Sequence, residues 1–244
     1  IRRPPDSTLF PYTTLFRSRF TIDSITVGER GIKPCRIFCI GKNYAEHIRE
    51  LDDFDAKLQT KNEQHPVVFM KPVTSIVSLG ESIHAPTHGN ILHHEAEVVV
   101  LLNGGGKNIL IEDSLSCIAG VTLGLDITLR DVQVKVKKKG HPWELSKSFD
   151  QSSPLGLMRS YDDSFDLFDI PFACFVNEEK RQEGNTKDMI FSIPQIISFL
   201  STVWKLMPGD LIYTGTPSGI SVIKSRDEIV LNSPMLGRFA WTVF

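Results

Sequence analysis

Short apolar runs, many of them bounded by glycine, proline or asparagine, are the feature that most limits how this chain can fold. They occupy residues 36–40, 66–70, 76–79, 98–102, 120–125, 171–176, 210–213 and 228–231. Runs of about four to eight residues between turn-forming residues are typical of β-strands. The sequence therefore predicts a β-rich α+β protein with a few short helices.

Helical periodicity is confined to a few segments. Residues 43–51 begin with Asn43 and carry Glu46 three positions later, the pattern of a capping box at a helix start. Residues 192–206 repeat apolar side chains every three or four positions and are followed by proline and glycine, which predicts an amphipathic helix and its end. Residues 112–119 show a weaker helical pattern.

Residues 1–18 differ from the rest of the chain. They include adjacent prolines, show neither helical nor strand periodicity, and carry basic but almost no acidic side chains. We expect this segment to be non-native or disordered and exclude it from fold reasoning. Residues 19–244 show no repeat, linker or change of composition, and their length suits one or two domains. We therefore expect them to form a single domain.

Charge and composition exclude some classes of partner. Lysine and arginine number 27 against 29 aspartates and glutamates, a net charge of −2, which gives no electrostatic basis for binding nucleic acid or an anionic membrane. No apolar run approaches the roughly 18 residues that a membrane-spanning helix needs. The four cysteines are spaced neither as a disulfide framework nor as a zinc ribbon, which favours reduced thiols in a cytoplasmic protein.

Three acidic side chains interrupt apolar strands and form a candidate metal site. Glu95 and Glu97 alternate along an extended segment, so both project from the same face. Asp126 breaks an apolar run that otherwise reads as buried, and a buried aspartate is usually paired or bound to a cation. Carboxylates suit Mg²⁺, Mn²⁺ or Ca²⁺. An exposed acidic strand face, or an aspartate that caps a turn, is the alternative at this point. The adjacent His93 and His94 would face opposite sides of a strand, which disfavours zinc.

Two further features suggest chemistry. His47 and Glu50 are three positions apart on the first predicted helix, and a histidine oriented by a carboxylate is the basic unit of general-base catalysis. A fortuitous surface pair is the alternative. Lys147 is flanked by serines and could offset carboxylate charge or bind an anionic substrate, or it could be a solvated lysine.

Several motifs occur in a fixed order along the chain. They are GKNYAEH (41–47), HEAE (94–97), DITLRDVQ (126–133), KKKGHPW (137–143), KSFD (147–150), RQEG (181–184) and YTGTP (213–217). This series resembles the fumarylacetoacetate hydrolase family, and in particular its small acylpyruvase and oxaloacetate-decarboxylase-like members. The resemblance covers about residues 35–244. It implies that residues 19–244 form a catalytic domain with a mixed β-roll fold, and that the protein is a homodimer.

The resemblance also implies one Mg²⁺ or Mn²⁺ ion per active site. The family's metal ligands fall on Glu95, Glu97 and Asp126. The family's lysine near the metal falls on Lys147. Residues 52–64 lie where the family has a mobile lid.

The family's remaining site positions fall on residues that this chain also retains. The catalytic dyad falls on His47 and Glu50. Substrate contacts are implied for Thr216, in the loop near the metal, and for Arg130 and Gln133, which line the same pocket.

We therefore expect a Mg²⁺- or Mn²⁺-dependent hydrolase that cleaves a C–C bond of acylpyruvate-type 2,4-diketo acids, such as acetylpyruvate or fumarylpyruvate, to pyruvate and a carboxylic acid. His47, backed by Glu50, would deprotonate the attacking water, and the metal with Lys147 would stabilise the departing enolate. Oxaloacetate decarboxylation and keto–enol tautomerisation pass through the same enolate and remain alternatives. Hydration or isomerisation of 2-oxo-alkenoates comes next, and a non-catalytic dimeric binding protein is the alternative outside enzymes.

Overall fold

A computed structural model describes residues 24–55, 65–162 and 165–244, with the side chains of residues 51–55 left out. The segment 1–18 and residues 56–64 of the expected lid lie outside the described residues. Residues 52–55, the first part of that expected lid, form the end of helix α1.

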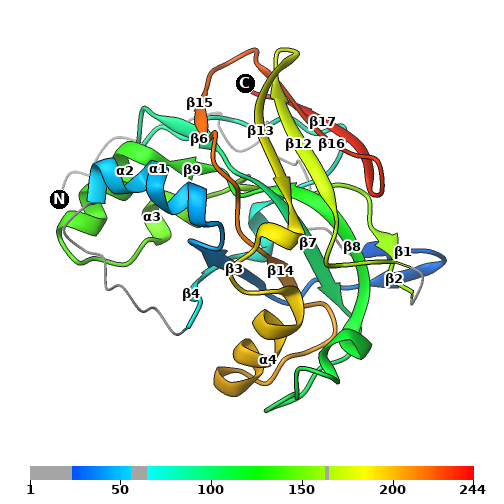
Figure 1. Ribbon diagram of the computed structural model, residues 1–244. Helices are drawn as coiled ribbons and strands as arrows, with labels where there is room; N and C mark the ends of the chain where they lie inside the picture. Colours follow the sequence, from blue (N-terminus) through cyan, green and yellow to red (C-terminus); the bar gives the residue numbers. More distant parts are fainter. Residues whose placement is uncertain (1–23, 56–64, 163–164) are drawn as a thin grey trace, which may run out of the picture.

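A six-stranded mixed sheet is the centre of the fold (Figure 1). Its strands run in the order β11-β8-β7-β14-β3-β4. Their bounds are β3 Ile37–Gly41, β4 Val67–Lys71, β7 Ala96–Leu102, β8 Ile118–Leu125, β11 Arg159–Ser160 and β14 Leu211–Tyr213. Strand β14 is parallel to β3 and antiparallel to β7, so the sheet is mixed.

Smaller sheets complete the β structure. An antiparallel four-stranded sheet has the order β13-β12-β16-β17, and a three-stranded sheet has the order β15-β6-β9. Two strand pairs, β1–β2 and β10–β5, are separate. The bounds are β1 Ile25–Val27, β2 Arg30–Ile32, β5 Ile76–Val77, β6 Leu92–His94, β9 Thr128–Leu129, β10 Ser153–Pro154, β12 Pro171–Val176, β13 Glu179–Asn185, β15 Ser221–Ile223, β16 Glu228–Ser233 and β17 Gly237–Thr242. The predicted β-rich α+β class is confirmed.

The helices of the described residues are short. They are α1 Ala45–Asp55, α2 Arg130–Lys138, α3 Glu144–Lys147 and α4 Ile193–Val203, with 3₁₀ turns at Val73–Ser75, Ser114–Cys117 and Thr186–Asp188. Helices α1, α2 and α3 gather on one side of the molecule, while α4 lies apart from them beyond β14 (Figure 1). None of the described helices is long and apolar enough to cross a membrane.

Two helix predictions need correction. The predicted capping box at Asn43 does not form, because helix α1 begins at Ala45 and the Asn43 side chain bonds elsewhere: its amide donates to the Thr214 carbonyl at 2.8 Å. The segment 112–119 contains only a 3₁₀ turn, since β8 begins at Ile118 and takes up the apolar residues that suggested a helix. Helices α2 and α3 were not expected from periodicity.

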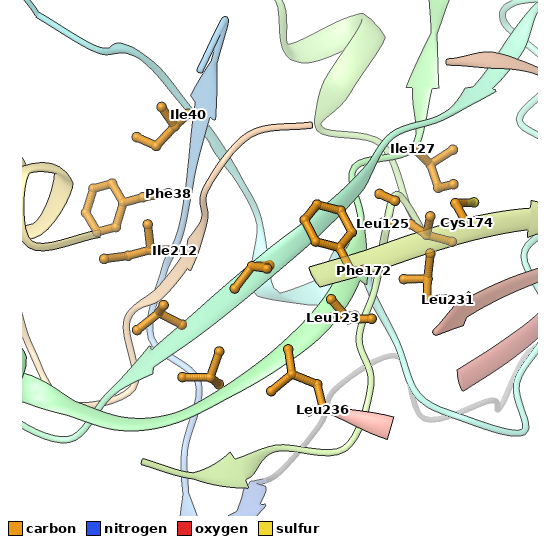
Figure 2. Packing of buried hydrophobic residues seen from close by; sticks show 14 of the residues in the cluster. Phe38, Ile40, Leu123, Leu125, Ile127, Phe172, Cys174, Ile212, Leu231 and Leu236 are labelled. Atoms are coloured by element: carbon orange, nitrogen blue, oxygen red, sulfur yellow. The ribbon is translucent and has the colours of Figure 1, made fainter. Parts of the chain in front are cut away.

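The core explains why the apolar runs lack alternation. Every residue of β7 and β8 is buried, because both faces of the central sheet are covered. Figure 2 shows side chains from several elements packed together: Phe38 and Ile40 from β3, Leu123 and Leu125 from β8, Phe172 and Cys174 from β12, Ile212 from β14 and Leu231 from β16. Packing of these side chains therefore joins the central sheet to the four-stranded sheet.

The four cysteines are free thiols.

Candidate active site

Strand pairing brings the three predicted carboxylates together. Glu95 lies between β6 and β7, Glu97 is in β7, and Asp126 directly follows β8. Strands β7 and β8 are antiparallel, so the start of one lies beside the end of the other, and the Asp126 amide donates to the Glu95 carbonyl at 2.8 Å. One oxygen from each carboxylate lies within 4.8 Å of the others, and all three residues are buried.

Two predicted cations neutralise part of this charge. The Lys147 ammonium, at the end of α3, lies 2.7 Å from Glu95 Oε2 and 2.6 Å from Asp126 Oδ2. Arg130, the first residue of α2, donates to the other oxygen of Glu95 and to Gln133. Lys147 is therefore not a solvated lysine: it is 3% exposed and lies between two carboxylates.

Lys71, a third cation, was missed by sequence reasoning. It is the last residue of β4, and its ammonium lies 2.7 Å from Asp126 Oδ1. Its hydrogen bonds are directed to the carbonyls of Ile127 and Ser152, at 3.1 and 2.7 Å, so Asp126 Oδ1 accepts no hydrogen bond of good geometry. A lysine that ends an apolar strand was the available signal.

The pKa values of the two glutamates are shifted in opposite directions. Burial opposes ionisation of Glu95, but Lys147, Arg130 and His47 outweigh it and hold its pKa well below the usual range. Burial, the nearby Asp126 and Glu95 all raise the pKa of Glu97 well above its usual range, against a hydrogen bond from Gly215. Glu97 therefore favours the neutral form until a cation compensates its charge.

The three carboxylates fit a hard divalent cation. Oxygen ligands are the set that Mg²⁺ and Mn²⁺ prefer. Asp126 Oδ1 is a buried acceptor without a hydrogen bond, and Glu97 is held where ionisation costs free energy. A bound ion would satisfy both. Neither adjacent histidine belongs to the set, which among the described residues consists of the three carboxylates, and His94 bonds instead to Gln182 and Ser221.

The predicted histidine–glutamate pair forms on helix α1. His47 is 4% exposed, and its Nδ1 lies 3.2 Å from Glu50 Oε2. The carboxylate of Glu50 also accepts hydrogen bonds from the Gly219 amide, at 3.1 and 3.2 Å. Gly219 has φ +95°, and a Cβ there would lie 2.0 Å from the Arg181 carbonyl, so this approach requires glycine. The pair is thus anchored from outside its own helix.

The loop after β14 contacts β7, the strand that carries Glu97, directly. The Gly215 amide donates to Glu97 Oε2 at 2.8 Å, and the Thr216 hydroxyl donates to the Ala96 carbonyl at 2.8 Å. Gly215 adopts φ +102°, and its backbone passes so near Asn43 that a Cβ would lie 2.7 Å from that side chain. Two hydrogen bonds therefore hold this loop against strand β7.

One pocket collects most of the predicted residues. Its lining includes seven of them: His47, Glu95, Asp126, Arg130, Gln133, Lys147 and Thr216. Glu97 and Glu50 are not part of the lining: Glu97 accepts from the Gly215 amide, and Glu50 contacts His47 and accepts from the Gly219 amide. Sequence reasoning missed the aromatic side of the pocket, where Phe69 and Trp143 have ring centroids 5.7 Å apart and the Lys137 ammonium lies 5.2 Å from the Trp143 ring centroid.

Removal of Lys71 provides a test of the buried charge cluster. Lys71→Met would leave Asp126 with one fewer counter-ion and the Ile127 carbonyl without its donor, while the Ser152 carbonyl would still accept from the Ile127 N–H. Breaking a buried ion pair costs about 3–5 kcal/mol, so we expect a loss of that size in the free energy of unfolding, measured in urea. The control is Lys180→Met, which removes an exposed pair with Glu183 and should cost less than about 1 kcal/mol. Equal losses in the two variants would contradict the role assigned to Lys71.

Fold and site together define a class: a mixed-sheet protein in which a buried carboxylate triad and a histidine–glutamate pair both contribute residues to one pocket. The chain belongs to the fumarylacetoacetate hydrolase family, because the family profile described as "Fumarylacetoacetate (FAA) hydrolase C-terminal" matches residues 36–244. The family resemblance drawn from the motifs is thereby confirmed.

Named relatives cover most of the chain. The mouse protein "Oxaloacetate tautomerase FAHD1, mitochondrial" is 42% identical over 79% of this chain and 84% of its own length. "Oxaloacetate tautomerase YcgM" of Escherichia coli strain K12 is 37% identical over 80% of this chain and 87% of its length. A crystal structure of fumarylpyruvate hydrolase from Pseudomonas aeruginosa with Mn²⁺ and pyruvate has a TM-score of 0.83 and 29% identity, covering 94% of this chain and 98% of that one.

Proposed function

We propose that this protein is a divalent-metal-dependent enzyme of short 2-oxo acids, and that its main reaction interconverts the keto and enol forms of oxaloacetate. The observation that carries the proposal is the placement of His47 on the same pocket as Glu95 and Asp126. A proton acceptor beside a metal-ligand set is what enolisation next to a polarised carbonyl requires. The names of relatives 37% and 42% identical support oxaloacetate as the substrate.

Charge balance supports a dianionic substrate. Lys71, Lys147 and Arg130 pair with Glu95 and Asp126, and none of these ion pairs involves Glu97. A divalent ion bound to the ionised triad would bring these six side chains to two formal positive charges, and Lys42 and Lys137 also line the pocket. Oxaloacetate carries two negative charges at neutral pH, whereas acetylpyruvate carries one, so the pocket favours the dicarboxylate.

Different residues of the chain would hold the metal ion, transfer the proton and orient the base. Glu95, Glu97 and Asp126 would hold Mg²⁺ or Mn²⁺, which when bound polarises the 2-oxo group and offsets the negative charge of the enolate. Glu50 accepts from His47 Nδ1–H, which leaves Nε2 to take the proton from the carbon next to the carbonyl. The product of this step is the enolate; a proton given to its oxygen by the imidazolium or by water completes the enol, and the reverse steps regenerate the keto form.

Hydrolysis of acylpyruvates is a second candidate, favoured by a specific observation. The pair of His47 and Glu50 can equally deprotonate a water molecule for attack on a distal carbonyl, after which Lys147 would stabilise the developing enolate of pyruvate. The structural likeness to a fumarylpyruvate hydrolase supports this reaction. Fumarylpyruvate, like oxaloacetate, is a dianion and satisfies the same charge balance.

An assay of one purified sample distinguishes the candidates. With the enzyme present, we expect Mg²⁺ to accelerate the conversion of enol oxaloacetate to the keto form, followed as a loss of ultraviolet absorbance. This acceleration should far exceed that of pyruvate release from oxaloacetate, acetylpyruvate or fumarylpyruvate. Release of pyruvate from fumarylpyruvate faster than the tautomerisation would make hydrolysis the main reaction. Absence of any Mg²⁺- or Mn²⁺-dependent turnover of these compounds would contradict both candidates.

A further inference from the structure

Gln182 is a buried polar side chain in an otherwise exposed stretch of strand. It belongs to the RQEG motif, which the proposed chemistry does not use. It is 1% exposed, while its neighbours Arg181 and Glu183 are exposed. Strand β13 belongs to the four-stranded sheet, yet the Gln182 amide contacts the strand that carries the carboxylates and the loop that follows β14. Gln182 thus connects segments that belong to different sheets and are far apart along the chain.

The contacts fix which end of the Gln182 amide is oxygen. One end lies 3.0 Å from the Ala96 backbone N–H, which can only donate, and the other lies 2.8 Å from the Pro217 carbonyl, which can only accept. Oε1 therefore faces Ala96, and Nε2 faces Pro217. Because Oε1 only accepts, the nearby His94 Nδ1, at 2.9 Å, must carry a proton.

The second amide hydrogen of Gln182 determines the role of Thr216. Nε2 donates to the Thr216 hydroxyl oxygen at 2.7 Å, and the hydroxyl gives its own proton to the Ala96 carbonyl at 2.8 Å. The hydroxyl has no second proton, so it retains one lone pair and has no donor to offer a ligand in the pocket that Thr216 lines. Gln182 and Thr216 together hold both the N–H and the C=O of Ala96, the residue between the two glutamates.

We propose that Gln182 is a positioning residue: it fixes the substrate-side loop (residues 214–217) against the carboxylate strand, and it makes the Thr216 hydroxyl a hydrogen-bond acceptor toward the pocket. Partners behind a metal ligand typically change metal affinity or activity by about 10–100-fold when they are removed. The role of the loop in substrate binding rests on the proposed function, whereas the hydrogen-bond network itself does not.

Two substitutions distinguish the bonds that the Gln182 amide donates from the bonds that it accepts. Gln182→Glu keeps an acceptor for Ala96 and His94 but loses the two donations to the loop. Gln182→Met loses all four bonds. Gln195→Met is the matched control, because the amide of Gln195 caps helix α4 at the exposed Ser192 end, away from the pocket.

The measurements are Mn²⁺ affinity and Mn²⁺-dependent pyruvate affinity by calorimetry, with the protonation of His94 Nδ1 followed by nitrogen NMR. For Gln182→Glu we expect about tenfold weaker pyruvate binding with nearly unchanged Mn²⁺ affinity, and for Gln182→Met about tenfold losses in both. The control should match the original protein. None of these readouts needs turnover, so failure of the oxaloacetate reaction would leave the test intact.

Particular results would overturn the positioning role. Unchanged pyruvate and Mn²⁺ affinities in both Gln182 variants would do so, as would losses confined to thermal stability. If Gln182→Met fails to fold, Thr216→Val takes its place, since it removes the hydroxyl at nearly constant shape and should weaken pyruvate binding as Gln182→Glu does. An unprotonated His94 Nδ1 in the original protein would contradict the assigned amide orientation without any variant.

Discussion

Replacement of Glu97 by glutamine should abolish tight binding of Mg²⁺ or Mn²⁺ and lower turnover by about a thousandfold or more. Glutamine keeps an oxygen that can accept from the Gly215 amide, so the loop contact survives. It supplies no negative charge, and the ion's stabilisation of a developing enolate is worth several kcal/mol, each 1.4 kcal/mol being about tenfold in rate. Calorimetric titration with Mn²⁺ and the steady-state rate measure the two losses.

The same substitution should not lower the stability of the metal-free folded protein, although it abolishes metal binding. Burial and the neighbouring Asp126 raise the pKa of Glu97, so the ionised form costs the metal-free folded protein free energy that it does not cost the unfolded chain. Glutamine removes that cost. We therefore expect Glu97→Gln to be as stable as the metal-free original or more stable, and to lose the increase in Tm that Mg²⁺ gives the original. Glu179→Gln, at an exposed pair with Arg181, should change neither binding nor Tm. An undiminished Mg²⁺-dependent increase in Tm in Glu97→Gln would rule out Glu97 as a ligand.

The parts that could be predicted from the sequence are those encoded locally. Alternation along an extended segment placed Glu95 and Glu97 on one side, and they do lie together. Asp126 was singled out because a charge interrupts an apolar run, and that run is indeed a buried strand up to Leu125. Spacing on one helix was enough to pair His47 with Glu50. In each case the signal lies within a few residues.

The parts that could not be predicted depend on distant partners. Lys71 meets Asp126 across 55 positions, and Gln182 meets Ala96 across 86, so the residues near each one do not identify its partner. Asn43 fits a capping box locally, but in the folded chain its amide donates to the carbonyls of Thr214 and Phe191, and its Oδ1 accepts from the Phe191 N–H. Tertiary contacts therefore override the local propensity of Asn43.

Replacement of His47 by alanine should separate the reactions that need a base from those that do not. A positioned general base contributes about 10²–10⁴-fold, so keto–enol interconversion, or hydrolysis if that is the main reaction, should fall by this factor. Decarboxylation of oxaloacetate requires no proton acceptor and should fall much less. Glu50→Gln should cause a smaller loss of about tenfold to a hundredfold, because glutamine can still accept from His47 Nδ1–H but gives less support to the imidazolium.

The comparison needs proof that the metal site is intact in the His47 variant. His47 lines the pocket but is not one of the three carboxylates, so Mn²⁺ affinity should stay within about threefold of the original, a loss well below that for removing a group that orients a ligand. His84→Ala, at an exposed histidine beside Phe244, is the matched control and should keep full activity. If His47→Ala tautomerises oxaloacetate and hydrolyses acylpyruvates at the original rates, with Mn²⁺ bound, the imidazole is not the base. The chemistry would then have to depend on the cation and Lys147 alone, since Lys147 is the ammonium in contact with two of the three carboxylates.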